Sequence, residues 1–425
     1  MFRRATLAAL WLVFLAKNLA AAGIPVSGRM LETSPQVRSQ AEITLEPILS
    51  ANDDARLRLS GTLGPPPVDR THPDAEGFFA LTAPEIGLWK VVTRAPGRLT
   101  MELPLVPLIE AAELPDLELP SAFELEVQVV DAEGQPIAAT IGAIAPANLY
   151  LEDSEEPVRP RVWRSSPRLT KADDDGVASL SVEYQETLRI EALAAGHPLT
   201  VAYAVGGEKP VRITLPLGVA RTVRIIDSRQ RTLAGAVAIN DGAFLPLGLS
   251  DAEGRLPLVL AMQEPPPVRV STNGGWRGAF EIARDTDTDL VQHLALTPPT
   301  DLRGQVLEVG RREPIGGALV WARPTEATVT DARGRYHLAI PRPEPASLQA
   351  AATGYLHGGV ELAPDVTDSP PLLLHPAAAL HGQVMDEDGN ALSQVDVAVV
   401  FASRSGTVRP ITNNPREQWL TRTTP

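Results

Sequence analysis

Short apolar runs separated by proline- and glycine-containing turns occupy most of the chain. In residues 245–249 apolar side chains alternate with other residues, and 256–258 and 290–296 continue this pattern after turns. Alternation at a period of two places one face of a strand on a core and the other in water. Six or seven such strands, about 8–12 residues apart, predict an antiparallel sandwich. No run shows a convincing helical period longer than two turns, so we expect an all-β protein.

An acidic residue ends a short apolar strand five times along the chain, at intervals of 78 to 99 residues. These anchors are Glu32, Asp131, Asp227, Glu308 and Asp386. Self-similarity at a near-constant period is typical of repeat architectures. The sequence therefore predicts a tandem array of small antiparallel Greek-key β-sandwich modules.

A second signature, Asp-x-x-Gly, follows the anchor in four of the five units. An aspartate in such a turn accepts hydrogen bonds from amides further along, and glycine supplies the positive φ that ends the turn. We interpret these residues as structural and not as calcium ligands, because no unit fits the twelve-residue calcium loop. The residues are Asp74 and Gly77, Asp173 and Gly176, Asp251 and Gly254, and Asp331 and Gly334.

The two signatures divide the chain into a leader and five modules. Residues 1–22 have a basic start, a short apolar run and a small-residue cleavage site, which predict a signal peptide. The modules are expected at 23–120, 121–217 (with a loop insertion at 152–171), 218–299, 300–378 and 379–425. Module 5 lacks the second half of the repeat, so we expect residues 379–425 to be poorly ordered and the chain to be a fragment.

The fourth unit contains the sequence motifs of a known domain. They are Leu302-Arg-Gly304-Gln-Val306, Pro314-Ile315-Gly-Gly-Ala318, Thr330-Asp331-Ala-Arg-Gly334-Arg-Tyr336 and Gly354-Tyr355. This unit resembles the carboxypeptidase regulatory-like domain, a seven-strand sandwich of the transthyretin-like, carbohydrate-binding-like type. The resemblance implies the fold of the other units as well, and it implies no activity, because a fold does not define a function.

Composition narrows the location and the chemistry. The chain has no cysteine, which excludes disulfides and thiol catalysis and makes a eukaryotic extracellular origin less expected than a bacterial one. Its net charge of −14, without a basic patch, argues against nucleic acid as a partner. The seven histidines are scattered and none has glutamate three residues later, so we expect no catalytic residue, metal or cofactor.

Two tryptophans in loops are the candidate ligand-binding residues. Trp163 lies in the insertion of module 2, where an acidic half at 152–156 precedes an arginine-rich half. Trp276 follows Asn273-Gly274-Gly275, and a tryptophan on such a loop can stack on a sugar ring. The competing interpretation for both tryptophans is a packing role. The competing interpretation for the insertion is a mobile loop whose charges pair loosely with one another.

These observations favour a non-enzymatic exported protein of the periplasm, cell surface or medium that acts as spacer and adhesion or interaction scaffold. Its partner would be a protein or polysaccharide at the cell surface, and no transmembrane span is expected beyond the leader. Prolines at the module junctions would limit bending and give a rod longer than about 100 Å. A carbohydrate-binding array and the non-catalytic part of a larger exported enzyme or outer-membrane protein are the alternatives.

Overall fold

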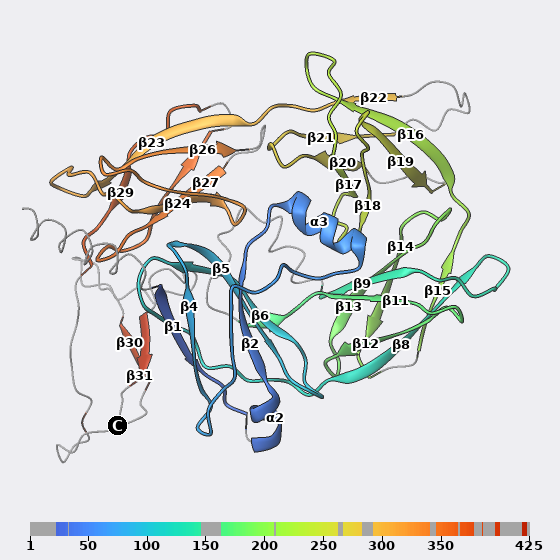
Figure 1. Cartoon of the computed structure of the whole chain (residues 1–425), viewed down its shortest axis with the longest axis horizontal. Coiled ribbons are helices and arrows are strands. Elements are labelled where there is room, and N and C mark those ends of the chain that lie inside the picture. The colour runs from blue at the N-terminus through green and yellow to red at the C-terminus, as the bar shows by residue number, and fades with distance from the viewer. Residues whose placement is uncertain are drawn as a thin grey trace, which may run out of the picture.

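The computed structural model shows an all-β protein of several small sandwiches (Figure 1). It describes residues 23–32, 34–145, 163–207, 210–261, 267–282, 292–340, 346–363 and 366–377, with residue 385 and the strands at 396–399 and 419–422. The predicted leader, the acidic half of the module 2 insertion and most of module 5 lie outside the described residues. In module 5 the structure describes the pair β30 (Asp396–Val399) and β31 (Trp419–Arg422).

Modules 1 and 2 each contribute seven strands to their own sandwich. Module 1 contains β1 (Ile24–Arg29), β2 (Glu42–Pro47), β3 (Asp69–Thr71), β4 (Phe78–Ala83), β5 (Gly87–Arg94), β6 (Met101–Leu108) and β7 (Ala112–Glu113). Module 2 contains β8 (Phe123–Asp131), β9 (Thr140–Ile144), β11 (Arg168–Lys171), β12 (Val177–Val182), β13 (Thr187–Leu193), β14 (Thr200–Val205) and β15 (Val211–Leu215).

Modules 3 and 4 repeat this arrangement. Module 3 contains β16 (Val219–Ile226), β17 (Val237–Asn240), β18 (Pro246–Leu249), β19 (Arg255–Leu260), β20 (Val268–Ser271), β21 (Arg277–Phe280) and β22 (Gln292–Ala295). Module 4 contains β23 (Thr300–Glu308), β24 (Leu319–Arg323), β25 (Glu326–Val329), β26 (Arg335–Ile340), β27 (Ala346–Ala351), β28 (Gly358–Leu362) and β29 (Leu372–Leu374).

Each sandwich consists of a three-stranded sheet packed on a larger sheet, and each module supplies four strands of that larger sheet. Pairing is antiparallel except that the last strand of every module runs parallel to its first, as β29 does beside β23. Four separate apolar clusters fill the sandwiches, spanning 26–119, 125–215, 223–296 and 302–374. Each sandwich therefore has its own core, as the alternating pattern predicts.

The two repeated signatures of the sequence meet in space. The glycine carbonyl of each Asp-x-x-Gly turn accepts a hydrogen bond from the amide two residues before the acidic anchor: Met30, Val129, Ile225 and Val306, at 2.7–2.8 Å. The turn thus fastens the fourth strand of the module to its first. Residues two positions after the glycine enter the cores; Phe79, Leu256 and Tyr336 are at most 5% exposed.

One strand leaves its own module. The short strand β10 (Arg164–Ser165), within the module 2 insertion, pairs with β6 and adds a fifth strand to the larger sheet of module 1. The Arg164 guanidinium lies 2.8 Å from the buried Glu102 carboxylate of β6, and the Ser166 hydroxyl donates to the same carboxylate. The insertion therefore fixes module 2 to module 1.

Two helices lie in module 1, α2 (Pro35–Gln40) and α3 (Ala51–Ser60). The expectation that no helix exceeds two turns is wrong for α3, which has ten residues. Its N-terminus is capped by the Ser50 side chain, which accepts from the Asp53 amide, and Gly61 ends it in the left-handed conformation. The buried side chains of α3 include Asn52 and Arg58, so the helix shows little apolar periodicity.

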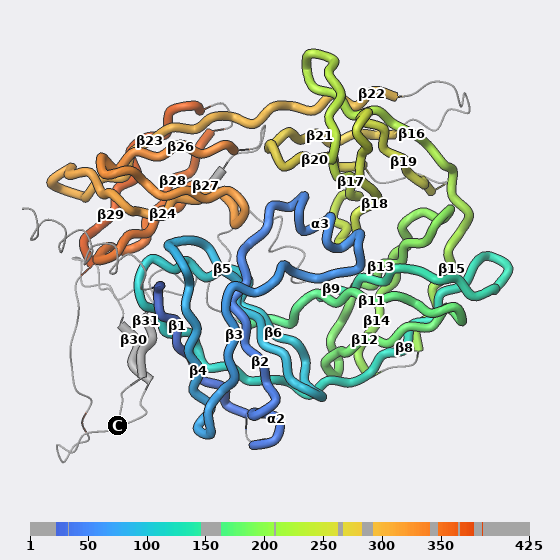
Figure 2. Tube along the Cα trace, in the orientation of Figure 1, coloured from blue at the N-terminus to red at the C-terminus, as the bar shows by residue number. Residues whose placement is uncertain are grey.

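The modules form a closed cluster around α3 and not the expected rod (Figures 1 and 2). Module 4 returns to module 1, where Leu319 and Trp321 share an apolar cluster with Leu88 and Leu105. Module 3 is joined to module 4 by an ion pair between Arg277 and Glu326, and to module 1 through α3. These contacts between distant parts of the sequence overcome the extended arrangement that proline-rich junctions suggest.

Candidate functional site

Trp163 packs against module 1. Its side chain is partly buried on the apolar core of that module, and its Nε1 donates a 3.0 Å hydrogen bond to the carbonyl of Pro115. The indole therefore has both apolar contacts and a hydrogen-bond partner for its N–H, as the packing interpretation expects. Its role in ligand binding remains a prediction.

Trp276 sits in the turn between β20 and β21. The amide of Thr272 donates to the Trp276 carbonyl, and the indole packs partly buried against the core of module 3. The same turn contacts module 1 and the linker to module 4: Asn273 donates to the carboxylate of Asp53 on α3, and a Cβ on Gly275 would lie 3.1 Å from Pro299. The turn is therefore held on both sides, and ligand binding by Trp276 is likewise a prediction.

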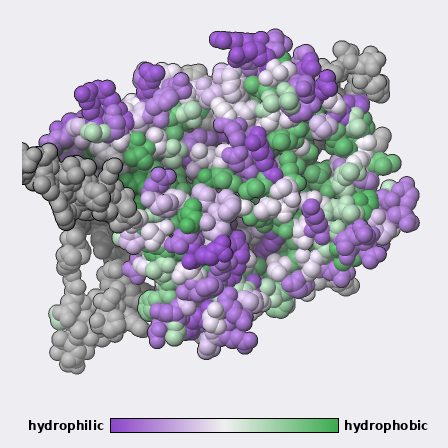
Figure 3. Space-filling model, viewed as in Figure 1, coloured by the Kyte–Doolittle hydropathy of each residue, from purple (hydrophilic) through white to green (hydrophobic). Residues whose placement is uncertain are grey.

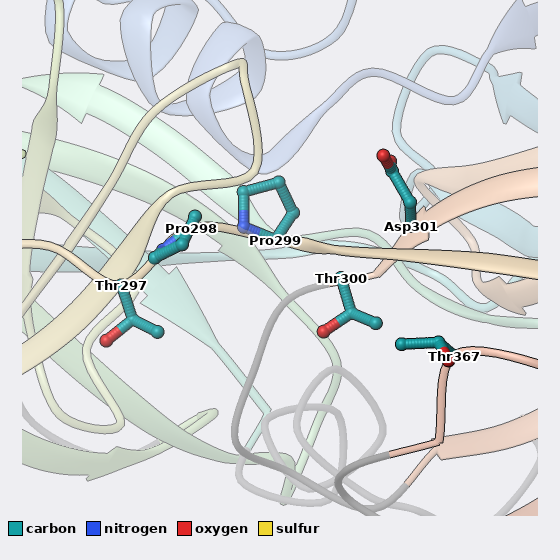
Figure 4. A pocket seen from close by; sticks show the side chains of 6 residues that line it. All are labelled: Thr297, Pro298, Pro299, Thr300, Asp301 and Thr367. Atoms are coloured by element: carbon teal, nitrogen blue, oxygen red, sulfur yellow. The ribbon is translucent and has the colours of Figure 1, made fainter. Parts of the chain in front are cut away.

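A hollow of about 320 Å³ lies at the linker between modules 3 and 4 (Figure 4). It is lined by Thr297, Pro298, Pro299, Thr300, Asp301 and Thr367. Thr297 and Thr300 point to the same side, with Thr367 next to Thr300, whereas Asp301 points the other way (Figure 4). The Oγ1 atom of Thr300 is buried and has no hydrogen-bond partner among the described residues.

Several buried polar groups meet at the junction of α3 with modules 2 and 3, which we call the Glu191 junction. Glu191 on β13 is fully buried and accepts hydrogen bonds from the amides of Phe244 at 2.9 Å and Leu245 at 2.7 Å. The Arg189 guanidinium lies 3.0 Å from the carboxylate and also donates to the carbonyl of Gly242. Phe244 and Leu245 pack with Ile144 in an apolar cluster around these groups.

Helix α3 completes the Glu191 junction from module 1. The Arg58 guanidinium lies over the Phe244 ring, 4.6 Å from its centroid, and donates to the Phe244 carbonyl. It is also paired with Asp54 at 2.8 Å on the same helix. The Asn52 side-chain amide donates to the backbone carbonyl of Ser271 in module 3, and its Oδ1 accepts from the Ser271 hydroxyl. The helix therefore binds module 3 mainly through polar side chains.

Burial raises the pKa of Glu191, and the hydrogen bonds from the Leu245 and Phe244 amides oppose that shift without cancelling it. A raised carboxyl pKa in a buried setting can mark an acid–base catalyst. Here both oxygens accept hydrogen bonds from backbone amides of the next module. The arrangement suits a role in fixing modules 2 and 3.

The Asp-x-x-Gly aspartates serve their own turns. In each, one carboxylate oxygen accepts from the amides two and four residues later, as Asp331 does from Arg333 at 2.8 Å and Arg335 at 2.9 Å. The same geometry holds at Asp74, Asp173 and Asp251. Within the described residues no group of three or more potential ligands is placed to hold a metal ion.

Sequence reasoning missed the Glu191 junction. Ser50 followed by Asp53, with Gly61 after the last turn, is a start-and-stop signal for a helix and was available in the sequence. Glu191 has no such signal, because the amides that it accepts from lie more than 50 residues away along the chain. In the part of the chain that the structure describes, neither helix has the length and hydropathy of a membrane span.

No protein-family model matches this chain, and no curated protein matches it. The resemblance to the carboxypeptidase regulatory-like domain is therefore still an interpretation of its motifs. Among solved structures, the chain is similar to the Bacillus anthracis TIE protein at 11% identity, covering 79% of this chain and 68% of that one, with a TM-score of 0.17.

A streptococcal ancillary pilin is 12% identical, over 65% of this chain and 98% of that one, with a TM-score of 0.18. A type II cohesin–X-dockerin complex from Acetivibrio cellulolyticus is 17% identical, over 24% of this chain and 59% of that one, with a TM-score of 0.17. Scores this low support no inference about function, which has to come from the chain itself.

Proposed function

We propose that this protein is a non-enzymatic exported scaffold that presents four fixed β-sandwich modules to a protein or polysaccharide partner at the cell surface. The observation that carries this proposal is the Glu191 junction. Its buried carboxylate, two arginines and a helix are all engaged in holding modules together. A chain whose polar groups fix its modules keeps its surface loops and edges at constant separations.

The surface is compatible with this role. Hydrophilic residues cover much of the outer rim of the face in Figure 3 and part of its middle, and hydrophobic residues are interspersed between them. The net charge of −14 favours solubility and weakens contact with anionic surfaces. A partner would then be recognised by local loops or edges rather than by a broad charged patch.

Two measurements test the scaffold. Small-angle scattering of the chain without residues 1–22 should give a compact particle with a maximum dimension below the roughly 100 Å of a four-module rod. Beads coated with the same protein should adhere to bacterial envelopes, whereas beads coated with the Glu191→Ala variant should adhere less because its modules are no longer fixed. An extended particle, or adhesion that is absent or unaffected by the variant, contradicts the proposal.

A polysaccharide partner is a second candidate, favoured by the hollow beside the Trp276 turn. Two prolines would offer a sugar apolar contact, and three threonines would offer hydrogen bonds, among them Thr300, whose hydroxyl has no partner in the described part of the chain. Bacterial polysaccharide should change tryptophan fluorescence in the wild type and in Trp163→Phe, but not in Trp276→Phe. Thr300→Val, which keeps the shape and removes the hydroxyl, should weaken binding. A blank glycan array, or equal responses from all four proteins, counts against this candidate.

A further inference from the structure

Strand β14 of module 2 has one edge that no described strand occupies. It is the outer strand of the sheet β11–β9–β13–β14, and among the described strands it pairs with β13 alone. Beyond that ladder, none of the backbone groups of residues 200–205 has a hydrogen bond among the described residues. Alternate amides and carbonyls therefore face outward, which is the arrangement that accepts another strand.

The edge of β14 lacks the protection found elsewhere. The other edge strands with at least five residues are β4, β12, β15, β19, β26 and β28. β15, β19, β26 and β28 contain arginine or glutamate, and β19 also contains proline. β4 and β12 lack charge, but the Asp69 carboxylate accepts from the Thr82 amide of β4, and Arg168 donates to the Ser181 carbonyl of β12. Charges and prolines at an edge prevent further pairing, and Thr-Val-Ala-Tyr-Ala-Val has neither.

The exposed side chains on and around β14 form an apolar surface. Tyr203 is 67% exposed, and Val201 lies on the same face. Leu217 is exposed near the start of the strand, where Gly218 donates to the Gly196 carbonyl. Tyr184 is exposed near its end, beside Gly207. Exposed apolar residues gathered along an open edge indicate an interaction surface.

The sequence of the strand identifies the partner. Residues 201–205 read Val-Ala-Tyr-Ala-Val, which is the same in both directions. When two copies pair antiparallel about a two-fold axis at Tyr203, Val201 faces Val205 of the second copy, alanine faces alanine, and tyrosine faces tyrosine. All of these pairs lie on matching faces, because opposed residues then differ by an even number of positions. Ala204 remains in the core while the valines and tyrosine pair outside it.

We infer that two copies of this protein pair through their β14 edges, joining two four-stranded sheets into one of eight strands. Pairs of aromatic and of β-branched side chains across antiparallel strands are favourable, and a two-fold interface is necessarily self-complementary. The chain already uses strand addition between modules, since β10 extends the sheet of module 1. This inference does not depend on the proposed scaffold function.

Sedimentation analysis of the chain without residues 1–22, at about 0.15 M salt to screen the repulsion between two acidic copies, tests the dimer. The dimer fraction should rise with concentration and should not progress to larger species. Tyr203→Lys and Tyr203→Glu should each weaken dimerisation about tenfold or more, because like charges then face each other. An equimolar mixture of the two variants should recover the dimer, because opposite charges meet.

Phe78→Lys is the matched control, since Phe78 is an exposed aromatic residue on the β4 edge strand. It should leave the dimer unchanged. A wild type that is monomeric at all concentrations overturns the inference. So does a Phe78→Lys variant that dissociates as far as Tyr203→Lys.

The absence of cysteine allows the register to be measured without background. Tyr203→Cys should form an intermolecular disulfide on oxidation, because facing residues in antiparallel strands have Cα atoms about 4.5–5.5 Å apart. Val201→Cys should not, because its two copies would lie about 13 Å apart, four residues out of register. A mixture of Val201→Cys and Val205→Cys should crosslink. Equal crosslinking by Tyr203→Cys and Val201→Cys would show unspecific aggregation and overturn the inference.

Discussion

Asp331 and Glu191 both accept hydrogen bonds from two backbone amides, yet their pKa values move in opposite directions. Asp331 receives its amides from its own turn at the surface, and the bond from Arg335 is the main cause that lowers its pKa. Glu191 receives its amides from another module, and burial raises its pKa despite those bonds. The amide hydrogen bonds lower the pKa of both carboxyls, and the net shifts differ because burial outweighs those bonds at Glu191 but not at Asp331.

The difference separates two tasks. The aspartate turns occur once in each of four modules and use contacts within a few residues, so they build a sandwich. The Glu191 junction occurs once and joins elements of three modules, so it determines how the sandwiches are arranged. Variants at the two kinds of site should consequently differ in size of effect and in which part of the molecule responds.

The largest effect is expected for Glu191→Ala. The change leaves Arg189 without its ion partner and two amides unsatisfied in a buried place, which costs about 3–5 kcal/mol in comparable cases. Hydrogen exchange should accelerate at the Phe244 and Leu245 amides and leave the Asp331 turn protected. Glu126→Ala, at an exposed position on β8 of the same module, is the control. Unchanged exchange at Phe244 would contradict the role assigned to Glu191.

Gly176→Ala should be next in size. Gly176 has φ near +71°, and a Cβ there would lie 2.3 Å from the Val129 carbonyl oxygen. We expect a loss of at least about 2 kcal/mol in the free energy of unfolding of module 2. Gly196→Ala separates strain from collision, because Gly196 has φ near +79° with no atom within 4 Å of a Cβ. Equal losses in a denaturant titration would show that the contact with the first strand is unimportant.

The pH dependence should have opposite sign at the two carboxylates. Because the folded pKa of Glu191 is raised, its contribution to stability is greatest below about pH 4.5, its unfolded value, and declines as pH rises through the folded pKa. Because the folded pKa of Asp331 is lowered, its contribution is present above about pH 3.8 and is lost as pH falls. Thermal unfolding from pH 3 to 8 checks this.

Glu191→Gln should therefore gain stability relative to wild type as pH rises, and Asp331→Asn should lose part of the acid sensitivity. The opposite trend for either variant would refute the corresponding pKa assignment.

The smallest effect concerns a turn that departs from the repeat. In module 3 the anchor Asp227 accepts from the amides of Arg229 and Arg231, but Gln230 occupies the position where module 2 has Gly134. Gln230 has φ near +64°, which strains a residue with a side chain. Gln230→Gly should stabilise module 3 by about 0.5 kcal/mol. Arg229→Gly, at a residue without positive φ, should destabilise it. If both variants changed the stability of module 3 in the same direction, the backbone strain assigned to Gln230 would be contradicted.

The sequence was sufficient for features that repeat and for features that are local. Alternating apolar residues predict the strands, and the spacing of Asp and Gly predicts turns such as Asp251–Gly254, because strand faces and turn angles depend on nearby residues. The hydrophobic pattern did not predict helix α3, because Asn52 and Arg58 occupy its buried face. Trp163 was expected in a loop of module 2, whereas it packs on module 1, and no local rule contains that information.

The addition of β10 to the sheet of module 1 also has a consequence for biosynthesis. Chains are made from the N-terminus, and early modules generally fold first. Strand β6 of module 1 ends at Leu108, but the strand that covers it begins at Arg164. Until some 56 further residues have been made, the β6 edge of the nascent first module is open. During that time Glu102, which is buried in the finished protein, lacks its ion partner Arg164. A chaperone that occupies this edge during that interval would protect the nascent chain, and completion of module 2 would release it.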